Sequence, residues 1–378
     1  MTDAVPNAMT VDSEALPPAS ATKSVDYSVR LLSELYATTE LHANSRRRVW
    51  VADESDSARD FPPGFRFDDP TLIVTNRIDV YRSHIQQERH VELSDFSFDQ
   101  VAEGEVDAIY YRVSKEKAVV HHVINCSARL LREGGSLYLT GEKGDGTKTY
   151  FEKAKQLLGA RRATWKKAKH GVYCGHLTRS TTEPVAPLDT QDYPELRPIA
   201  DLEGIRFDSK PGIFGWNKID QGSALLIEQL PRFIEQGQPP TTLLDLGCGY
   251  GYLAVMAGRQ LEIAITATDN NAAATAACER NMQINGIRGQ VLLDDCGSDI
   301  DTRFDLILCN PPFHRGFSTH SELTQRFLEN TQRLLAPGGA ALFVVSRFIP
   351  LETMAVPYFT QVERCGADGS FKIVSLRH

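Results

Sequence analysis

The chain has 378 residues, a formal net charge of −8 and seven cysteines. Its length suits two domains of ordinary size, and its acidic balance excludes indiscriminate binding to nucleic acid, so an RNA-binding role would need a local basic face. The cysteines follow no CxxC spacing, which argues against a disulfide framework or a zinc site and predicts free thiols in a reducing compartment.

Residues 1–24 are rich in Ala, Pro, Ser and Thr and predict a disordered tail. They contain no basic segment followed by an apolar core, as a secretory leader would, and the chain shows no apolar run long enough for a membrane helix. We therefore expect a cytoplasmic monomer with no membrane partner and no metal.

Residues 25–180 predict a first α/β domain, with strand-like stretches at 48–53, 107–113 and 136–140. A basic run near its end surrounds Trp165 and comprises Lys153, Lys155, Arg161, Arg162, Lys166, Lys167 and Lys169. Such a run is common on a solvated surface. If the substrate is RNA, the run also predicts phosphate contacts, together with the tripeptide 46–48.

Residues 181–204 predict a linker, and residues 205–378 a second α/β domain. Within the second domain, 241–256 has the pattern of a buried strand, a glycine-rich turn and a helix. Gly247, Gly249 and Gly251 allow close backbone approach by a ligand at the helix start. The spacing is GxGxG, not the GxGxxG of dinucleotide sites, and Asp245 beside it would repel a pyrophosphate but suits an ammonium group. This pattern favours a cofactor that carries an amino acid.

Two further acids follow predicted strands of the same domain. Asp269, with Asn270 beside it, lies about twenty residues beyond the glycine loop, where a carboxylate can bind both hydroxyls of a ribose. Asp295 closes the next apolar run and can accept a hydrogen bond from an adenine amine. Each acid alone is typical of a solvated strand end or a helix cap. Together they predict a ligand crevice at the carboxyl ends of the strands.

A fourth predicted strand ends in the run Asn310, Pro311, Pro312, Phe313 and His314. Two prolines cannot continue a sheet ladder, so carbonyl groups and an amide side chain are held clear of the sheet beside an aromatic ring. Such a cluster can accept hydrogen bonds from a planar NH2 group. The alternative is a proline-rich turn that only ends the strand.

The two halves also share an internal pattern. Residues 107–140 and 305–343 both contain an Asp-initiated strand, a helix that ends before Gly-Gly, and another strand. In the first copy, Tyr111-Arg112-Val113 occupies the place of Asn310-Pro311-Pro312, and acids and serines follow 48–53 in place of glycines. The pattern predicts an N-terminal copy without a cofactor site, although two unrelated α/β domains would share some of these features.

Together, Asp245-Leu-Gly-Cys-Gly, Asp269 and Asn310-Pro-Pro-Phe resemble class I S-adenosylmethionine-dependent methyltransferases that act on an amino nitrogen. The segment 212–223, the NPPFH form of the motif and the ending that begins at Phe371-Lys372 resemble the RsmC and RlmG types of ribosomal RNA guanine-N2 methyltransferase. This resemblance implies two tandem Rossmann-like methyltransferase domains with a degenerate N-terminal copy that serves RNA binding or structure. It also implies that Phe214 and Asp220 fold over the cofactor. Trp216 stands where relatives often carry a polar residue.

The resemblance implies methylation of the exocyclic N2 of a guanine, with Asn310 and the Pro311 carbonyl orienting the amine and Phe313 stacking on the base. His314 would contact the base or a phosphate, or cap local backbone. We favour 16S rRNA of the 30S subunit over 23S rRNA of the 50S subunit. Protein glutamine-N5 methylation, adenine-N6 methylation of DNA and a relic, non-enzymatic RNA-binding role remain alternatives. The intact motif counts against the last.

Overall fold

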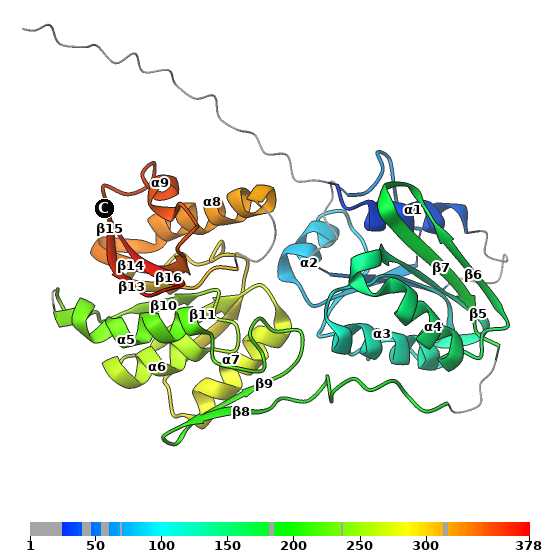
Figure 1. The fold of residues 1–378 in the computed structure, drawn as a ribbon, viewed down its shortest axis with the longest axis horizontal. Coiled ribbons are helices and arrows are strands. Elements are labelled where there is room, and N and C mark those ends of the chain that lie inside the picture. Colours follow the sequence, from blue (N-terminus) through cyan, green and yellow to red (C-terminus); the bar gives the residue numbers. More distant parts are fainter. Residues whose placement is uncertain are drawn as a thin grey trace, which may run out of the picture.

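The computed structural model describes residues 25–39, 47–53, 60–68, 70–180, 185–235, 237–312 and 317–378, without the side chains of 317–321. Two α/β units lie side by side, each built on a seven-stranded sheet (Figure 1). Within the described residues, no helix combines the length and apolar character that a membrane crossing requires.

The N-terminal unit has the strand order β3-β2-β1-β4-β5-β7-β6, in which β7 and β6 are antiparallel to their neighbours. Its strands are β1 (Arg48–Ala52), β2 (Thr71–Thr75), β3 (Val91–Leu93), β4 (Val106–Arg112), β5 (Leu131–Glu142), β6 (Arg162–Lys167) and β7 (Val172–Thr178). Its helices are α1 (Tyr27–Thr38), α2 (Ile78–Ile85), α3 (Lys117–Leu130) and α4 (Thr147–Leu157).

The C-terminal unit repeats this topology with the order β12-β11-β10-β13-β14-β16-β15. Its strands are β10 (Leu243–Leu246), β11 (Ile265–Asp269), β12 (Gly289–Leu293), β13 (Phe304–Cys309), β14 (Leu335–Ser346), β15 (Gln361–Ala367) and β16 (Phe371–Arg377). Its helices are α5 (Gln221–Glu235), α6 (Tyr252–Leu261), α7 (Ala272–Ile284), α8 (Phe317–Leu334) and α9 (Leu351–Ala355). The expected repeat of two Rossmann-like units is therefore confirmed.

The repeat extends to the aspartates that open β4 and β13. Asp107 accepts a hydrogen bond from the Arg47 amide at 3.0 Å, and Asp305 accepts one from the Thr241 amide at 2.9 Å. The pairing of each strand with its successor also slips at the same place, next to these aspartates. In both copies the aspartate thus fixes the start of the central strand against its neighbour.

The copies differ in the connection that follows the central strand. In the C-terminal unit, β10 leads through the glycine loop into α6. In the N-terminal unit, the described residues between β1 and β2 form no helix, and Phe61, Phe65 and Phe67 pack on Trp50 with ring centroids 5.2–6.4 Å apart. Aromatic side chains therefore cover the sheet face where the other copy places a helix.

Apolar cores lie on both faces of each sheet, as expected for strands that are buried on both sides. In the C-terminal unit, α5, α6 and α7 cover one face, and α8 and α9 cover the other. The fully buried β10 (Leu243–Leu246) runs through the centre, so the residues that follow it emerge between the helical layers. This placement sets the position of the glycine loop.

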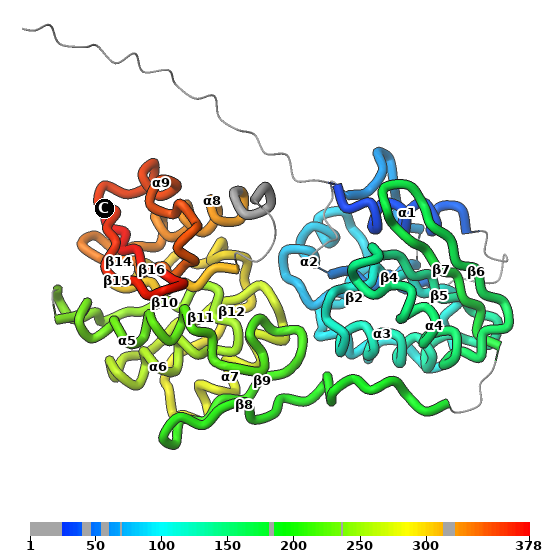
Figure 2. Tube along the Cα trace, viewed as in Figure 1, coloured from blue at the N-terminus to red at the C-terminus, as the bar shows by residue number. Residues whose placement is uncertain are grey.

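A two-stranded hairpin precedes the catalytic sheet. It consists of β8 (Arg197–Leu202) and β9 (Ile205–Ser209), and it contacts α7 through β9. Residues 185–196 run along one edge of the molecule toward this hairpin (Figure 2). Strand β8 therefore lies inside the segment 181–204 that we expected to be a linker, of which residues 181–184 lie outside the described residues.

Candidate cofactor and catalytic site

The glycine loop joins β10 to α6 at the carboxyl edge of the sheet. Gly251 has φ = 88°, and a Cβ atom there would lie 2.7 Å from the Cys278 sulfur, so both conformation and packing require glycine. The loop is also tied down by Asn281, whose buried amide donates to the Tyr250 and Asp208 carbonyls at 2.7 Å each. Packing and hydrogen bonds therefore fix the path of the loop.

Asp245 is fully buried beneath this loop. Its Oδ2 accepts a hydrogen bond from the Ala254 amide at 2.9 Å, whereas Oδ1 is buried with no hydrogen-bond partner among the described residues. Burial raises the pKa of Asp245 to about 7, with a further contribution from the charge of Asp269. A buried acceptor without a donor is costly, and it fits a ligand that supplies a positive donor such as an ammonium group.

Asp269 ends β11 beside the loop. Its Oδ2 accepts from the Gly249 amide at 2.9 Å and its Oδ1 from the Asn271 amide at 3.0 Å. Burial raises its pKa, and these amides and Arg77 oppose that rise. Each carboxylate oxygen can accept a second hydrogen bond, which leaves capacity for two ribose hydroxyls.

Asn270 and Asp295 lie next along this edge. The Asn270 carbonyl accepts from the Ile78 amide of the N-terminal unit at 3.0 Å. Asp295 forms an ion pair with Arg326 of α8 and retains further acceptor capacity for an amine. The neighbouring Asp294 is instead used within the turn, where it accepts from the Asp295 amide at 2.7 Å and from Ser298 at 2.9 Å.

Asn310 follows β13 and is half-buried. Its Nδ2 donates to Asp220 Oδ1 at 2.7 Å and to the Ser223 hydroxyl at 2.8 Å. Because both amide protons are engaged, the group that remains for a ligand is the Oδ1 acceptor. Asp220 also accepts from the Ser223 amide at 2.9 Å at the start of α5. Its side chain therefore contacts Asn310, and the implied role of Asp220 over the cofactor stays a prediction.

The remaining residues of the motif lie in different environments. Pro311 is buried and Pro312 is exposed, while Phe313 and His314 lie outside the described residues. Phe214 is 47% exposed in the turn before α5. Trp216 packs on the hydrophobic core of the catalytic unit, and the guanidinium of Arg197 lies 4.9 Å from the centre of its ring.

The basic run lies far from this edge of the catalytic unit. The predicted RNA contacts Arg161, Arg162, Lys166, Lys167 and Lys169 are all exposed, on or next to β6. Strand β6 is at the opposite sheet edge from β3, and α2, which connects β2 to β3, lies toward the catalytic unit (Figure 1). Six strand spacings of about 4.8 Å, roughly 29 Å in total, separate β6 from β3.

The tripeptide 46–48 was the other predicted RNA contact. Arg47 is paired with Glu105 at 2.5 Å and Arg48 with Asp68 at 2.9 Å, and Arg46 lies outside the described residues.

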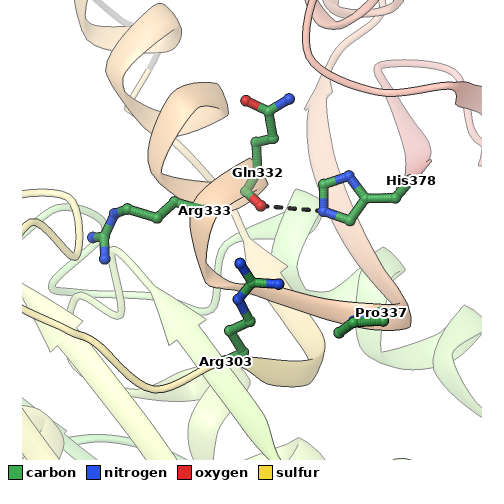
Figure 3. A pocket seen from close by; sticks show the side chains of 5 residues that line it. All are labelled: Arg303, Gln332, Arg333, Pro337 and His378. Atoms are coloured by element: carbon green, nitrogen blue, oxygen red, sulfur yellow. Dashed lines mark hydrogen bonds between the residues drawn. The ribbon is translucent and has the colours of Figure 1, made fainter.

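A shallow hollow elsewhere on the catalytic unit is lined by Arg303, Gln332, Arg333, Pro337 and His378 (Figure 3). The His378 ring lies 3.1 Å from the Gln332 carbonyl. These residues lie where β13 and β14 begin, at the amino ends of the strands, whereas the glycine loop lies at their carboxyl ends. Ligands of open α/β sheets bind at the carboxyl edge, so this hollow is not part of the site.

Sequence reasoning overlooked two residues of the site. Ser223 holds the Asn310 amide, and its only signal was its position at the end of the segment 212–223. Arg77 of the N-terminal unit interacts electrostatically with Asp269 and Asp295. It belongs to no motif, so it could be found only once the two units were placed together.

The fold, the glycine loop and the strand-end acids define a class I S-adenosylmethionine-dependent methyltransferase. Residues 204–375 match the Methyltransferase small domain family. Ribosomal RNA small subunit methyltransferase C of Aeromonas hydrophila subsp. hydrophila is 30% identical over 276 residues, covering 71% of this chain and 76% of that protein. The same-named protein of Serratia proteamaculans is 28% identical over 309 residues, covering 77% and 83%. The chain therefore belongs to the ribosomal RNA small subunit methyltransferase C family.

A solved structure agrees with this assignment at the level of the fold. It is the T. thermophilus 16S rRNA N2 G1207 methyltransferase (RsmC) in complex with AdoMet and guanosine. The similarity has a TM-score of 0.76 at 22% identity and covers 93% of this chain and 92% of that one. Both units of the present chain are thus included in the shared fold.

Proposed function

We propose that the protein transfers a methyl group from S-adenosylmethionine to the exocyclic N2 of a guanine in 16S rRNA. The observation that carries this proposal is the orientation of Asn310, whose two amide protons are bound by Asp220 and Ser223. The amide therefore presents only an acceptor, which suits an NH2 group of the substrate. The names of the family members supply the substrate class, since the motif chemistry alone does not choose the RNA.

The guanine amine is a weak nucleophile because its lone pair is delocalised into the ring. Hydrogen bonds from the NH2 group to Asn310 Oδ1 and the Pro311 carbonyl would favour a pyramidal nitrogen, whose lone pair is no longer delocalised into the ring. This is stabilisation by prearranged dipoles, and it needs no strong general base. The base must leave its helix or loop to reach this edge, and Phe313 is placed by sequence to stack on it.

The residues at the carboxyl edge fit the cofactor. The Oδ1 of Asp245, which has no partner among the described residues, would bind its ammonium group, Asp269 its ribose hydroxyls and Asp295 its adenine amine. We assign Gly247, Gly249 and Gly251 to backbone contact and Asn270 and Phe214 to the rim of the same pocket. When bound, S-adenosylmethionine supplies a methyl group activated by a sulfonium.

The N-terminal unit would serve as the substrate-binding and structural copy. The pairing of β4 with β5 and of β13 with β14 makes Arg112 equivalent to Asn310, one residue beyond the Tyr111 that the sequence pattern had placed there. Arg112 pairs with Asp26 at 3.2 Å and Asp145 at 3.8 Å. This side chain network fills the position where the catalytic copy holds its amide. The exposed residues of β6 would bind RNA phosphates about one domain away from the target base, fixing the orientation of the substrate.

The test is methyl transfer from labelled S-adenosylmethionine to ribosomal subunits from cells that lack this gene. The 30S and 50S subunits are assayed separately, and the modified nucleoside is identified. We expect N2-methylguanosine in 30S subunits, with loss of product in Asn310→Ala and retained cofactor binding. Label only in 50S subunits would favour 23S rRNA, and label in protein would favour glutamine methylation. Either result would overturn the proposal.

A further inference from the structure

The two units meet at a pair of equivalent loops. The Ile78 amide donates to the Asn270 carbonyl at 3.0 Å, and the Ala272 amide donates to the Asn76 carbonyl at 2.8 Å. Residues 76–78 follow β2 and enter α2, while residues 270–272 follow β11 and enter α7. Because β2 and β11 hold the same place in the two sheets, the contact is close to two-fold symmetric.

This contact involves the loop that follows Asp269. The N-terminal unit therefore touches the catalytic unit at the proposed ribose site and not at a remote surface. A further contact lies alongside it, where Arg82 of α2 reaches Asp294 at 3.2 Å. The two acids assigned to the nucleoside, Asp269 and Asp295, thus lie next to the interface.

Arg77 lies at the centre of the bridge. Its Nε is 3.1 Å from Asp79 Oδ1, and its side chain is 19% exposed. The guanidinium interacts electrostatically with both Asp269 and Asp295 across the interface. The other charged or titratable groups around these acids include Asp245, Cys248, Asp79, Asp294, Cys296 and Arg326. Arg326 pairs with Asp295, which leaves Arg77 as the cation that acts on Asp269 among the described residues.

We propose that Arg77 is a positioning residue for cofactor binding, supplied by the non-catalytic copy, which keeps the Asp269 carboxylate charged and able to accept both ribose hydroxyls. The inference rests on the proposed assignment of Asp269 to the cofactor ribose. It adds a role for the N-terminal unit that is separate from RNA binding. A carboxylate accepts two hydroxyl donors, whereas a protonated carboxyl must turn one of its oxygens into a donor.

The test measures the Kd for S-adenosylmethionine by calorimetry on the full chain, without RNA, at pH 5.5 and pH 8.5. Arg77→Gln should weaken binding at least about threefold at pH 5.5 and less than about twofold at pH 8.5, because a one-unit rise in the pKa of Asp269 costs at most a factor of ten. Arg77→Lys keeps the charge and should stay within about twofold of the unchanged protein at both pH values.

Two further variants separate charge from packing. Asp79→Asn removes the carboxylate that competes for Arg77, so cofactor binding should tighten about twofold at pH 5.5. Asp95→Asn is the matched control, because Asp95 belongs to another ion pair between the units, with Lys210, and neither residue is among the main groups that act on Asp269. It should leave the Kd unchanged.

Equal weakening of binding by Arg77→Gln at both pH values, or none at either, would overturn the inference. Weakening by Asp79→Asn would do the same, since it would show that the loop needs the ion pair for its shape. If the unchanged protein bound no S-adenosylmethionine, the proposed function itself would fail, which is a different result from failure of this inference.

Discussion

Asn310 illustrates how neighbouring side chains determine what an amide can do. Free in solution, it could donate or accept, and a rotation of its terminal group would exchange the two roles. Asp220 and Ser223 bind both protons of its NH2 group, at 2.7 and 2.8 Å, so the oxygen is directed to the open side. Specificity for an amine therefore depends on two residues that precede the sheet, as well as on the motif itself.

Replacing Asp220 by Asn should lower kcat for RNA methylation about tenfold, because a charge-assisted hydrogen bond to Asn310 becomes a neutral one. The Kd for S-adenosylmethionine should stay within about twofold, as the side chain contacts Asn310. Steady-state kinetics and calorimetry measure the two quantities. Ser223→Ala, which leaves Asp220 in place, should show a smaller loss. A parallel loss of cofactor affinity would instead support a role for Asp220 over the cofactor.

Asp245 predicts a pH dependence for cofactor binding. Its pKa is raised by burial to about 7, so the carboxyl is protonated below that pH and charged above it. An ammonium group binds the charged form, and binding of S-adenosylmethionine should therefore tighten as the pH rises from 5.5 to 7.5, a range in which an α-amino group stays mostly protonated. Calorimetry across this range checks the prediction. Asp245→Asn should bind weakly with a flatter profile, and an unchanged profile would assign the dependence to another group.

At the scale of the element, the sequence predicted strands that lead into a recognisable motif more reliably than strands that lead into none. The strand at 241–246, its glycine turn and its helix were predicted because buried strands and helix starts have local signatures. Strand β8 was missed because Pro198 and the prolines before it are typical of a linker, although Gly204 in the two-residue turn between β8 and β9 is a local hairpin signal. Arg77 was missed for a different reason, since its role depends on docking between the units.

Strand β6 shows how one element can serve both packing and binding. Trp165 packs on Phe151 and Tyr173, with centroids 5.0 and 5.4 Å away, while the basic residues face solvent. As an edge strand, it also needs charged side chains to prevent pairing with another chain. The positive residues therefore have a structural use, which leaves their contribution to RNA binding to be measured.

A combined change of Arg162, Lys166 and Lys167 to Gln should raise the KM for 30S subunits with little effect on kcat. The slope of log affinity against log salt concentration should also become shallower, by about 0.7–0.9 for each phosphate that the variant no longer neutralises. Filter binding over a range of salt concentrations measures this slope. Arg259→Gln, an exposed change on α6, serves as the control. Equal behaviour of the two variants would limit the basic residues to protecting the sheet edge.

At the scale of the whole molecule, a buried polar cluster helps to join the two units. Lys210 is nearly fully buried and pairs with Asp95, which also accepts a 2.6 Å hydrogen bond from the Tyr193 hydroxyl. The Lys210 ammonium lies 4.1 Å from the centre of the Tyr193 ring. This cluster joins the end of β9 to the N-terminal unit.

Asp95→Ala should lower the free energy of unfolding by about 3 kcal/mol, because it leaves a buried ammonium without a carboxylate. Urea denaturation measures the change. Glu105→Ala, which removes the exposed partner of Arg47, should cost less than about 1 kcal/mol. Equal effects of the two variants would show that the Lys210 ammonium gains water on loss of its partner.

The near-symmetric bridge between loops 76–78 and 270–272 has the form of a homodimer interface, yet both halves belong to one chain. A dimer of separate units would dissociate on dilution and withdraw Arg77 from the ribose loop. Covalent fusion makes the encounter intramolecular, with an effective concentration set by the segment that joins the units. The charge balance around Asp269 is therefore independent of protein concentration, and a protein that is scarce in the cell keeps the same cofactor affinity as one that is abundant.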